Sequence, residues 1–246
     1  MIPKIIHYCW FGGSPLPRYA QRCIESWRKF FPDYEIKEWN ESNFDVNMSP
    51  YTQAAFAAKK YAFVSDFARF WILSREGGLY FDTDVEICKS FDDVIDNGAF
   101  MGVETIRQDA MPLVNPGLAL GAEIGNPVIK SLLDYYWTLP SCHFDSKQPI
   151  ETVVVHTTRV LARDFSLKGE DGIQRLNGIT IYPIDYFNPF DDLTGVLNKT
   201  ENTHSIHWFA KSWQNAPMWY FRLTRMLHRL LGVNTLARLK SLWGNQ

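Results

Sequence analysis

Two aspartates one residue apart, Asp82 and Asp84, are the side chains of this chain best suited by type and spacing to do chemistry. They follow the glycine pair Gly77-Gly78 and a short apolar run, Leu79 to Phe81, which predicts a buried strand. Alternate side chains of an extended chain share a face, so the two carboxylates are expected roughly 7 Å apart. Such carboxylates repel each other unless a hard cation lies between them, with phosphate oxygens as further ligands. The segment therefore predicts a site for Mg²⁺ or Mn²⁺ with a diphosphate, although Asp-x-Asp also occurs in solvated turns.

A second polar pair, Asp66 and Arg69, precedes these aspartates. It lies in a segment, residues 51–76, that is predicted to be helical, and the three-residue spacing puts both side chains on one helix face. A surface ion pair is one interpretation. The other is a buried pair that needs a polar ligand, because the neighbouring residues are apolar nearly all round the helix. These apolar neighbours are Phe63, Val64, Phe67, Phe70, Trp71, Ile72 and Leu73.

Length and composition bound the class of protein. The 246 residues suit one large domain or two small ones, and 46% hydrophobic and 21% charged residues are typical of a soluble globular protein. A net charge of −2 argues against bulk nucleic-acid binding. The cysteines Cys9, Cys23, Cys88 and Cys142 form no CxxC pair, which favours reduced thiols in the cytoplasm over a zinc site or disulfides. We expect neither a signal peptide nor a transmembrane helix.

The elements before residue 40 should position an aromatic side chain at the edge of a sheet. Strands are predicted at Ile2–Phe11 and Tyr34–Trp39, with a helix at Arg18–Phe31 between them, which is the β-α-β opening of a nucleotide-binding α/β fold. Trp10 lies at the end of the first strand, next to Gly12-Gly13. It is either a core residue or a flat surface for a nucleobase.

The middle of the chain continues the α/β pattern. Strands are predicted at Phe100–Glu104, Gly117–Gly121 and Ile179–Tyr182, a loop at 105–115, and helices at 127–139 and 150–164.

A further strand-like segment ends at His207, and Lys211, Ser212 and Trp213 follow it. A lone histidine is more often structural than a ligand. Beside two carboxylates a neutral imidazole can still bind a metal, and a lysine can neutralise a diphosphate.

The last stretch is basic and amphipathic. From Met218 to Gln246 the chain has no acidic residue, and arginines and leucines alternate at helical spacing. Such a segment either lies on an anionic membrane surface or packs on the domain with its basic face in water. We therefore divide the chain into a domain over residues 1–215 and an amphipathic helical segment over 216–246.

Taken together, three motifs resemble glycosyltransferase family 32, which includes bacterial capsule and O-antigen sugar transferases, and the catalytic domain of the clostridial glucosylating toxins. The resemblance spans roughly residues 3 to 215, about 87% of the chain, and its combined motif is specific although each part alone is not. The motifs are His7-x-x-Trp10-x-Gly12, Ser65-Asp66-x-x-Arg69 and Gly77-Gly78-x-Tyr80-x-Asp82-x-Asp84, followed by Ile181-Tyr182-Pro183, Tyr186-Phe187-x-Pro189 and His207-x-x-x-x-Ser212-Trp213.

The resemblance implies a GT-A fold, in which a Rossmann-like mixed sheet is flanked by helices, here with the basic amphipathic tail. It implies retaining, metal-dependent transfer of a hexose from a nucleoside-diphosphate sugar, with a UDP-sugar favoured, and Mn²⁺ or Mg²⁺ as cofactor. By position, Asp66, Arg69, Asp82 and Asp84 would be catalytic. The metal ligands would be Asp82, Asp84 and His207, and the donor would contact Trp10, Ser65, Asp66, Arg69, Tyr80, Asp82, Asn115, Lys211, Ser212 and Trp213.

Acceptor contacts stay unassigned, because the segment Thr152 to Arg159 lacks a Gly-Pro turn common in eukaryotic members of the family. The absence of a predicted leader or anchor, together with the basic tail, favours a lipid-linked oligosaccharide at the inner face of a bacterial cell membrane. Two other functions compete. Asp82 and Asp84 also resemble the nucleophile motif of haloacid dehalogenase-type phosphatases, and the chain could instead be a noncatalytic sugar-binding or membrane-scaffolding protein.

Overall fold

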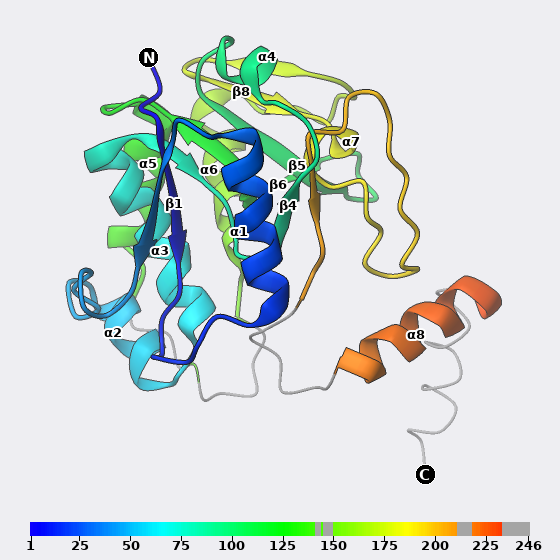
Figure 1. The fold of residues 1–246 in the computed structure, drawn as a ribbon. Helices are drawn as coiled ribbons and strands as arrows, with labels where there is room; N and C mark the ends of the chain where they lie inside the picture. Colours follow the sequence, from blue (N-terminus) through cyan, green and yellow to red (C-terminus); the bar gives the residue numbers. More distant parts are fainter. Residues whose placement is uncertain (141–143, 145–149, 211–217, 233–246) are drawn as a thin grey trace.

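The computed structural model describes residues 1–140, 144, 150–210 and 218–232 (Figure 1). Helices and strands alternate along most of this part of the chain. Their order is β1 (Ile5–Cys9), α1 (Arg18–Phe30), β2 (Glu35–Trp39), α2 (Pro50–Ala57), α3 (Tyr61–Glu76), β3 (Gly78–Tyr80), β4 (Val85–Ile87), α4 (Asp92–Ile95), β5 (Phe100–Ile106), β6 (Pro112–Ala122), α5 (Pro127–Trp137), α6 (Val153–Phe165), β7 (Gln174–Leu176), β8 (Ile179–Tyr182), α7 (Ile184–Phe187), β9 (Ser205–His207) and α8 (Met218–Leu231).

A mixed seven-stranded sheet organises the molecule, with the strand order β2-β1-β3-β6-β5-β8-β7. Strands β2, β1 and β3 run parallel, and β1 is joined to β2 through α1, so the predicted β-α-β opening is confirmed. Strand β6 is antiparallel to both β3 and β5, β8 is parallel to β5, and β7 is antiparallel to β8. The parallel half places the carboxyl ends of β1 and β3 together, where ligands bind in such sheets.

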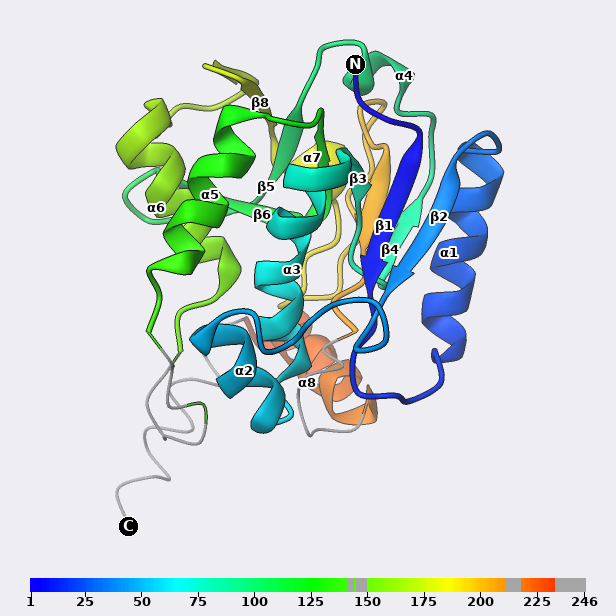
Figure 2. The same ribbon diagram turned by 90° about the vertical axis from the view of Figure 1, so that its left-hand side faces the viewer.

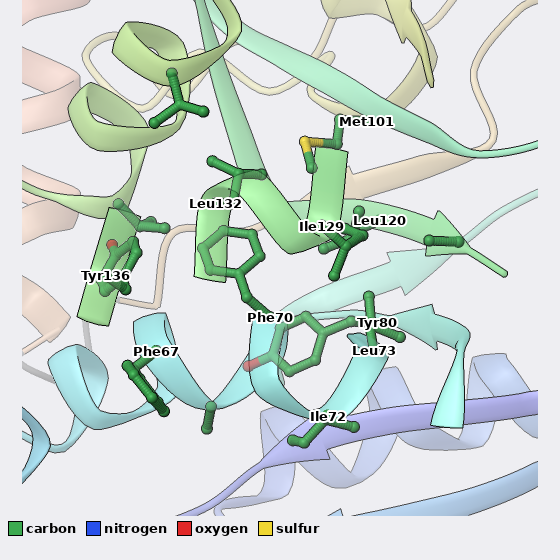
Figure 3. Packing of buried hydrophobic residues seen from close by; sticks show 14 of the residues in the cluster. Phe67, Phe70, Ile72, Leu73, Tyr80, Met101, Leu120, Ile129, Leu132 and Tyr136 are labelled. Carbon is green, nitrogen blue, oxygen red and sulfur yellow. The ribbon is translucent and has the colours of Figure 1, made fainter. Parts of the chain in front are cut away.

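Helices cover both faces of this sheet, as the views in Figures 1 and 2 show. On one face α3 and α5 pack side by side, with α6 next to them; on the other face lies α1. Each layer has its own apolar cluster. Figure 3 shows the α3 side, where Phe67, Phe70 and Leu73 meet strand residues and α5. Tyr80, from β3, lies in this cluster at 1% exposure, so the strand that leads into the two aspartates is firmly packed.

A separate two-stranded ribbon, β4 with β9, carries the segment after the aspartates. It is antiparallel, and Val85 pairs with His207. Helix α1 anchors it, because Nε1 of Trp27 donates to the Val85 carbonyl at 2.7 Å and the Ile87 amide donates to Oγ of Ser26 at 2.9 Å. The ribbon therefore fixes both a residue next to Asp84 and His207 itself.

Two sequence predictions about elements are wrong in detail. The single helix over residues 51–76 is two helices, because Lys59 has a φ of +56° that no α-helix accommodates. The loop predicted over 105–115 is shorter, since β5 extends to Ile106 and β6 begins at Pro112. These two strands pair along their length despite two register shifts. The remaining predicted strands and helices are found within a few residues of their expected ends.

The basic amphipathic segment forms helix α8 over Met218–Leu231, at the end of the molecule to which β1 and β2 point (Figures 1 and 2). Within the described residues, no helix combines the length and the apolar character needed to cross a membrane.

Candidate active site

The two aspartates lie in a turn that directly follows β3. The strand ends at Tyr80, and the Val85 amide donates to the Asp82 carbonyl at 3.0 Å. The Asp82 amide donates to the Gly117 carbonyl of β6 at 2.9 Å. The expectation of two carboxylates on one face of an extended chain is therefore wrong. The turn sends Asp82 and Asp84 toward different partners.

Asp82 faces a buried arginine. Nη2 of Arg69 lies 3.3 Å from Oδ1 of Asp82 and 2.9 Å from Oδ1 of Asp66, and the side chain of Arg69 is 3% exposed. The hydroxyl of Tyr80 donates to Oδ1 of Asp82 at 3.3 Å, and the Arg69 guanidinium lies 4.8 Å from the centre of the Tyr80 ring. The structure confirms that Asp66 and Arg69 share one helix face, and both side chains are buried. Arg69 also contacts Asp82, the first aspartate of the motif.

Asp66 is held in place from a second helix. Its carboxylate accepts a hydrogen bond from the Val153 amide at the beginning of α6. Burial raises the pKa of Asp66 to about 7, against the opposing effect of Arg69. The first turn of α6, which carries the positive end of the helix dipole, therefore lies beside the Asp66 carboxylate. Ser65 takes part through its backbone, since its carbonyl accepts from Nε of Arg69 at 3.1 Å.

Residue 117 is a glycine because the Asp82 carboxylate occupies the space that a side chain would need. A Cβ on Gly117 would overlap Oδ2 of Asp82 and lie 3.0 Å from Nη1 of Arg69. Nη1 of Arg69 is buried and has no hydrogen-bond partner among the described residues. A buried guanidinium donor without a partner costs about 1–3 kcal/mol, and a ligand oxygen would recover it. Nη1 of Arg69 is therefore a candidate hydrogen-bond donor to a polar ligand such as a sugar hydroxyl.

Asp84 faces the second ribbon strand. Its Oδ1 lies 3.1 Å from Nε2 of His207, and its Oδ2 accepts from the Ala210 amide at 2.8 Å. Burial lowers the pKa of His207, but Asp84 outweighs it and raises that pKa to about 9. Burial would raise the pKa of Asp84, yet His207 and the amide hold it below its usual value. The pair is therefore an ion pair when no metal is bound.

Two of the three predicted ligands for a divalent metal, Asp84 and His207, lie next to each other. Among the described residues no three His, Cys, Asp or Glu side chains form a metal-binding group, and Asp82 faces Arg69 instead. However, Asp84 and His207 bring an oxygen and a nitrogen to 3.1 Å, close to the roughly 3 Å between adjacent ligands in an octahedral Mg²⁺ site. Mg²⁺ commonly takes one or two protein ligands and fills the rest with water and phosphate oxygens. The Asp84 carboxylate fits such an ion, whereas His207 would have to release its Nε2 proton to become a second ligand and is a less usual one for Mg²⁺, which prefers oxygen.

A polar network behind Gly117 was not predicted from the sequence. Oδ1 of Asn115 accepts from the Gly117 amide at 2.7 Å, and Nδ2 of Asn115 donates to Oε2 of Glu104 at 2.6 Å. Nδ2 of Asn188 donates to the Glu104 carbonyl at 2.9 Å. The predicted contact of Asn115 with the donor stays a prediction, and in the structure Asn115 holds the strand beside Asp82. Glu104 and Asn188 carry no motif signal, because the pairing of β5 with β6 brings Glu104 here and the end of α7 brings Asn188.

The two aromatic residues of the amino-terminal motif, His7 and Trp10, have different surroundings. His7 is buried, and both of its ring nitrogens are engaged, Nε2 with the Gly77 carbonyl at 2.9 Å and Nδ1 with Nε1 of Trp39 at 3.1 Å. Trp10 is half-buried at the end of β1, with its indole nitrogen on the Ser14 carbonyl at 2.6 Å. Lys211, Ser212 and Trp213 lie outside the described residues, so their predicted contacts stay predictions.

Comparison with known proteins adds independent information about this region. Residues 17–101 match a family model described as a glycosyltransferase sugar-binding region containing a DXD motif. An uncharacterized glycosyltransferase of Acanthamoeba polyphaga mimivirus is 32% identical over 137 residues, which are 52% of this chain and 53% of that protein. The chain thus spans about half the length of this curated relative.

A solved structure supports the assignment of the fold, and a second is reported with it. A glycosyltransferase involved in the glycosylation of the major capsid of PBCV-1 is similar over 86% of this chain and 95% of its own, with 13% identity and a TM-score of 0.50. The structure titled PaToxG glycosyltransferase is 21% identical over 66% of this chain and 70% of its own, with a TM-score of 0.49. The mixed sheet flanked by helices is the predicted GT-A fold. These findings agree with the resemblance to a glycosyltransferase drawn from the sequence, since residues 17–101 of this chain match the model of a glycosyltransferase sugar-binding region containing a DXD motif.

Proposed function

We propose that this chain is a retaining, metal-dependent glycosyltransferase that moves a hexose from a nucleoside-diphosphate sugar, with a UDP-sugar favoured, to a saccharide acceptor. The observation that carries the proposal is that Asp82 and Asp84 lie in two different surroundings. The Asp82 carboxylate lies beside a buried arginine that has a donor without a partner among the described residues, and the Asp84 carboxylate lies 3.1 Å from Nε2 of His207. A sugar on one side and a charged diphosphate on the other match these two environments.

The donor sugar would lie over Arg69. Its hydroxyls would accept from the unpartnered Nη1 of Arg69 and donate to Asp66 and Asp82. Both carboxylates are already fixed by Arg69, so they need no reorganisation when the ligand arrives. The base would stack on Trp10, at the carboxyl end of β1. As the family resemblance implies, the donor would also contact Ser65, Tyr80, Asn115, Lys211, Ser212 and Trp213.

The metal side would consist of Asp84 and His207, with Asp82 as the third predicted ligand. A bound Mn²⁺ or Mg²⁺ would stabilise the negative charge that develops on the leaving diphosphate. The chain's own contribution is to hold Asp84 through the Ala210 amide and to present Nε2 of His207 beside it. We name no general base, because a leaving phosphate can itself take the acceptor proton.

The competing phosphatase hypothesis fits the geometry less well. In that mechanism the second aspartate acts as a general acid and needs a carboxyl oxygen free to carry a proton. Both oxygens of Asp84 are engaged, one with His207 and one with the Ala210 amide, and the pKa of Asp84 is lowered by its neighbours even though burial opposes this. The comparisons also favour a glycosyltransferase. A membrane-scaffolding role leaves the buried Arg69 donor without a purpose, and a noncatalytic sugar-binding role leaves the Asp84–His207 pair without one.

For the acceptor we propose a lipid-linked oligosaccharide of capsule, O-antigen or exopolysaccharide synthesis, with the enzyme in the cytoplasm and peripheral on the inner face of the membrane. The basic composition of residues 218–246 supports this. We retain the proposed division into a transferase domain over 1–215 and an amphipathic segment over 216–246.

Hydrolysis of nucleotide sugars without acceptor tests the proposal. We expect UDP-glucose, UDP-galactose, their N-acetyl forms and GDP-mannose to differ, with one donor cleaved in the presence of Mn²⁺ and not with EDTA. Asp82→Asn should lose at least about 100-fold in rate, whereas Asp96→Asn, an exposed control, should not change. Release of phosphate from p-nitrophenyl phosphate without cleavage of any donor would instead support the phosphatase. Proton NMR of the first-formed product reports whether the anomeric configuration is retained.

A further inference from the structure

A further carboxylate, that of Glu104, lies at the same edge of the sheet as the two aspartates. Strand β6 is antiparallel to both β3 and β5, so β3 and β5 run in the same direction and their carboxyl ends meet at one edge. Glu104 is near the carboxyl end of β5, which ends at Ile106. Ligands bind at this edge of open α/β sheets. The proposed roles of Asp82 and Asp84 leave Glu104 unused.

Glu104 occupies a break in the pairing of β5 with β6. Val103 pairs with Val114, and Thr105 pairs with Leu113. Glu104 lies between these pairs and has no partner residue on β6. Such a bulge turns a side chain away from its regular direction, and bulges are frequent beside active sites. Strand β5 is buried as far as Val103, and Glu104 is half-buried, so the strand meets solvent at this residue.

Two asparagines hold Glu104 in place. Nδ2 of Asn115 donates to Oε2 of Glu104 at 2.6 Å, and Nδ2 of Asn188 donates to the Glu104 carbonyl at 2.9 Å. Both asparagines are 6% exposed. Among the described residues, none forms a hydrogen bond with Oε1, the second carboxylate oxygen. The carboxylate is therefore oriented by one oxygen and keeps the other for a ligand.

Glu104 acts on the same space as the two aspartates. Burial lowers the pKa of His207, Asp84 opposes this most strongly, and the charges of Asp82 and Glu104 add to the effect of Asp84. Asp82 and Asp84 each have a cation beside them, Arg69 and His207, whereas no described residue forms an ion pair with Glu104. A carboxylate in this situation repels a diphosphate, but it accepts hydrogen bonds from the hydroxyls of a neutral sugar.

The contacts place Glu104 at the opposite end of the site from the proposed donor sugar. Arg69 contacts Asp82, whose amide donates to the Gly117 carbonyl. The Gly117 amide donates to Asn115, which in turn donates to Glu104. The Arg69 end of this series is buried, with the arginine side chain 3% exposed, and the Glu104 end meets solvent. A second saccharide therefore has access to the donor from the Glu104 end.

We propose that Glu104 binds the saccharide acceptor, with Oε1 accepting a hydrogen bond from a hydroxyl next to the one that attacks. The inference rests on the proposed function, since only a transferase has an acceptor. It deepens that function by giving the acceptor side a residue and a charge preference. Because Glu104 is negative, the acceptor sugar is a neutral hexopyranoside and not a uronic acid or a sugar phosphate.

Glu104 orients the acceptor and takes no proton. The attacking hydroxyl oxygen forms the new bond to the anomeric carbon of the donor, and the bond from that carbon to the diphosphate oxygen breaks with its electron pair. The proton of the attacking hydroxyl passes to the leaving diphosphate. Asn115 is a positioning residue in this scheme, because it fixes Oε2 of Glu104 and the Gly117 amide at the same time.

Transfer to simple glycosides tests the inference. The probes are the p-nitrophenyl glycosides of β-glucose, β-galactose, α-mannose and N-acetyl-β-glucosamine, supplied with Mn²⁺ and the donor that the hydrolysis assay identifies. We expect the wild type to glycosylate at least one of them. Glu104→Gln keeps an oxygen for Asn115 but loses the charge, and it should raise the KM for that glycoside at least about tenfold with little change in the KM for the donor. Glu25→Gln, exposed on α1, should match the wild type in both constants.

The charge preference gives a readout that a purely structural role of Glu104 would not move. The matched p-nitrophenyl uronide differs from the accepted glycoside by a carboxylate at C6. The wild type should use the neutral glycoside at least about tenfold more efficiently than the uronide, and Glu104→Gln should narrow this ratio. An unchanged ratio would overturn the proposal.

Asn115→Ala separates acceptor binding from support of the donor site. It releases Gly117 as well as Glu104, so it should slow donor hydrolysis and transfer alike. Glu104→Gln should instead lower the ratio of transfer to hydrolysis by about tenfold. If Glu104→Gln raised the KM for the donor as Asn115→Ala does, and left the ratio of transfer to hydrolysis unchanged, Glu104 would be a support of the donor site and the proposal would be wrong.

The two proposals fail in different ways. Donor hydrolysis by the wild type, with equal transfer by the wild type and Glu104→Gln, would refute the acceptor role and leave the transferase standing. Donor hydrolysis with no transfer to any of the four glycosides would refute the acceptor role in the same way. Wild-type protein that cleaves no nucleotide sugar, with or without the glycosides, would count against the transferase itself, and the acceptor role would fall with it.

Discussion

Gly117 lies so close to Asp82 that no larger residue fits between them. A Cβ at position 117 would overlap Oδ2 of Asp82, and the Gly117 carbonyl at the same time accepts from the Asp82 amide at 2.9 Å. Strand β6 therefore sets the position of the first aspartate of the motif from both sides, through a hydrogen bond and through steric contact. This is a long-range relationship that the Asp-x-Asp pattern does not reveal.

Gly117→Ala should consequently impair the site more than the fold. The added methyl group must push the Asp82 carboxylate away from Arg69 or shift β6, and we expect donor hydrolysis to fall at least about 100-fold. Gly98→Ala is the control, because Gly98 has a φ of +87° and no other atom within 4 Å of the added Cβ. It should cost about 1 kcal/mol of stability from backbone strain and leave the rate unchanged. Full activity of Gly117→Ala would show that Asp82 need not occupy the position seen here.

Arg69→Lys tests whether the guanidinium shape matters or only its charge. A lysine can pair with one carboxylate, but it cannot span Asp66 and Asp82 while also keeping a further donor for a ligand, as Nη1 of Arg69 does. We expect the rate of donor hydrolysis to drop about 100-fold or more, with a lower melting temperature because buried carboxylates lose partners.

Arg75→Lys, at an exposed position on the same helix, is the matched control for this change. Its guanidinium stacks on Trp71 at 4.3 Å from the ring centre, away from the aspartates. It should retain its rate. Similar losses for both variants would mean that the helix, and not the site, is sensitive to lysine.

Part of this site is predictable from the sequence because the information is local. The three-residue spacing of Asp66 and Arg69 and the apolar residues around them predict a shared, buried helix face, and an apolar run before Asp82 predicts that a strand delivers it. The orientation of Asp84 is not predictable in that way. It depends on the turn closed by the Val85 amide and on the pairing of Val85 with His207, more than 120 residues further along the chain.

The break between α2 and α3 shows the same limit. Residues 51–76 have helical composition throughout, yet the chain turns at Lys59, where the backbone adopts a positive φ. The first helix has its own capping box at Ser49 and Thr52, and Tyr61 of the second packs against Phe56 of the first. Tertiary packing of these aromatic rings prevails over the local tendency to continue the helix.

Acid should destabilise the protein partly through His7. Burial lowers the pKa of His7 to about 4, below the value of 6.5 expected in the unfolded chain. The neutral ring is also required by its contacts, since Nδ1 accepts from Trp39 and only Nε2 can carry the proton. As pH falls from about 6.5 to 4, His7 takes up a proton in the unfolded state but stays neutral in the folded state. Acid therefore favours unfolding. This contribution is absent above pH 7 and costs up to about 3 kcal/mol of stability near pH 4.

Chemical denaturation at pH 7, 6, 5 and 4 measures this effect. His7→Gln should be less stable than the wild type at pH 7 and should lose less further stability on acidification. Nitrogen NMR of the ring should find Nδ1 unprotonated in the folded protein at pH 5. A His7 ring that titrates near pH 6.5 in the folded state would contradict the prediction.

Arg225 and Arg229 offer a matched pair for testing how α8 is coupled to the site. They lie one turn apart, but only Arg225 bonds Asp192 and the Phe209 carbonyl. Without Arg225, the left-handed conformation at Phe209 loses one of the contacts that hold it, and the Ala210 amide becomes less well placed toward Asp84. Arg225→Gln should therefore slow donor hydrolysis about five- to tenfold in solution, whereas Arg229→Gln should not. Asp192→Asn should reproduce part of the loss, and the double variant with Arg225→Gln should be no worse than Arg225→Gln alone. Equal rates for the two arginine variants would show that α8 rests on the domain without affecting Asp84.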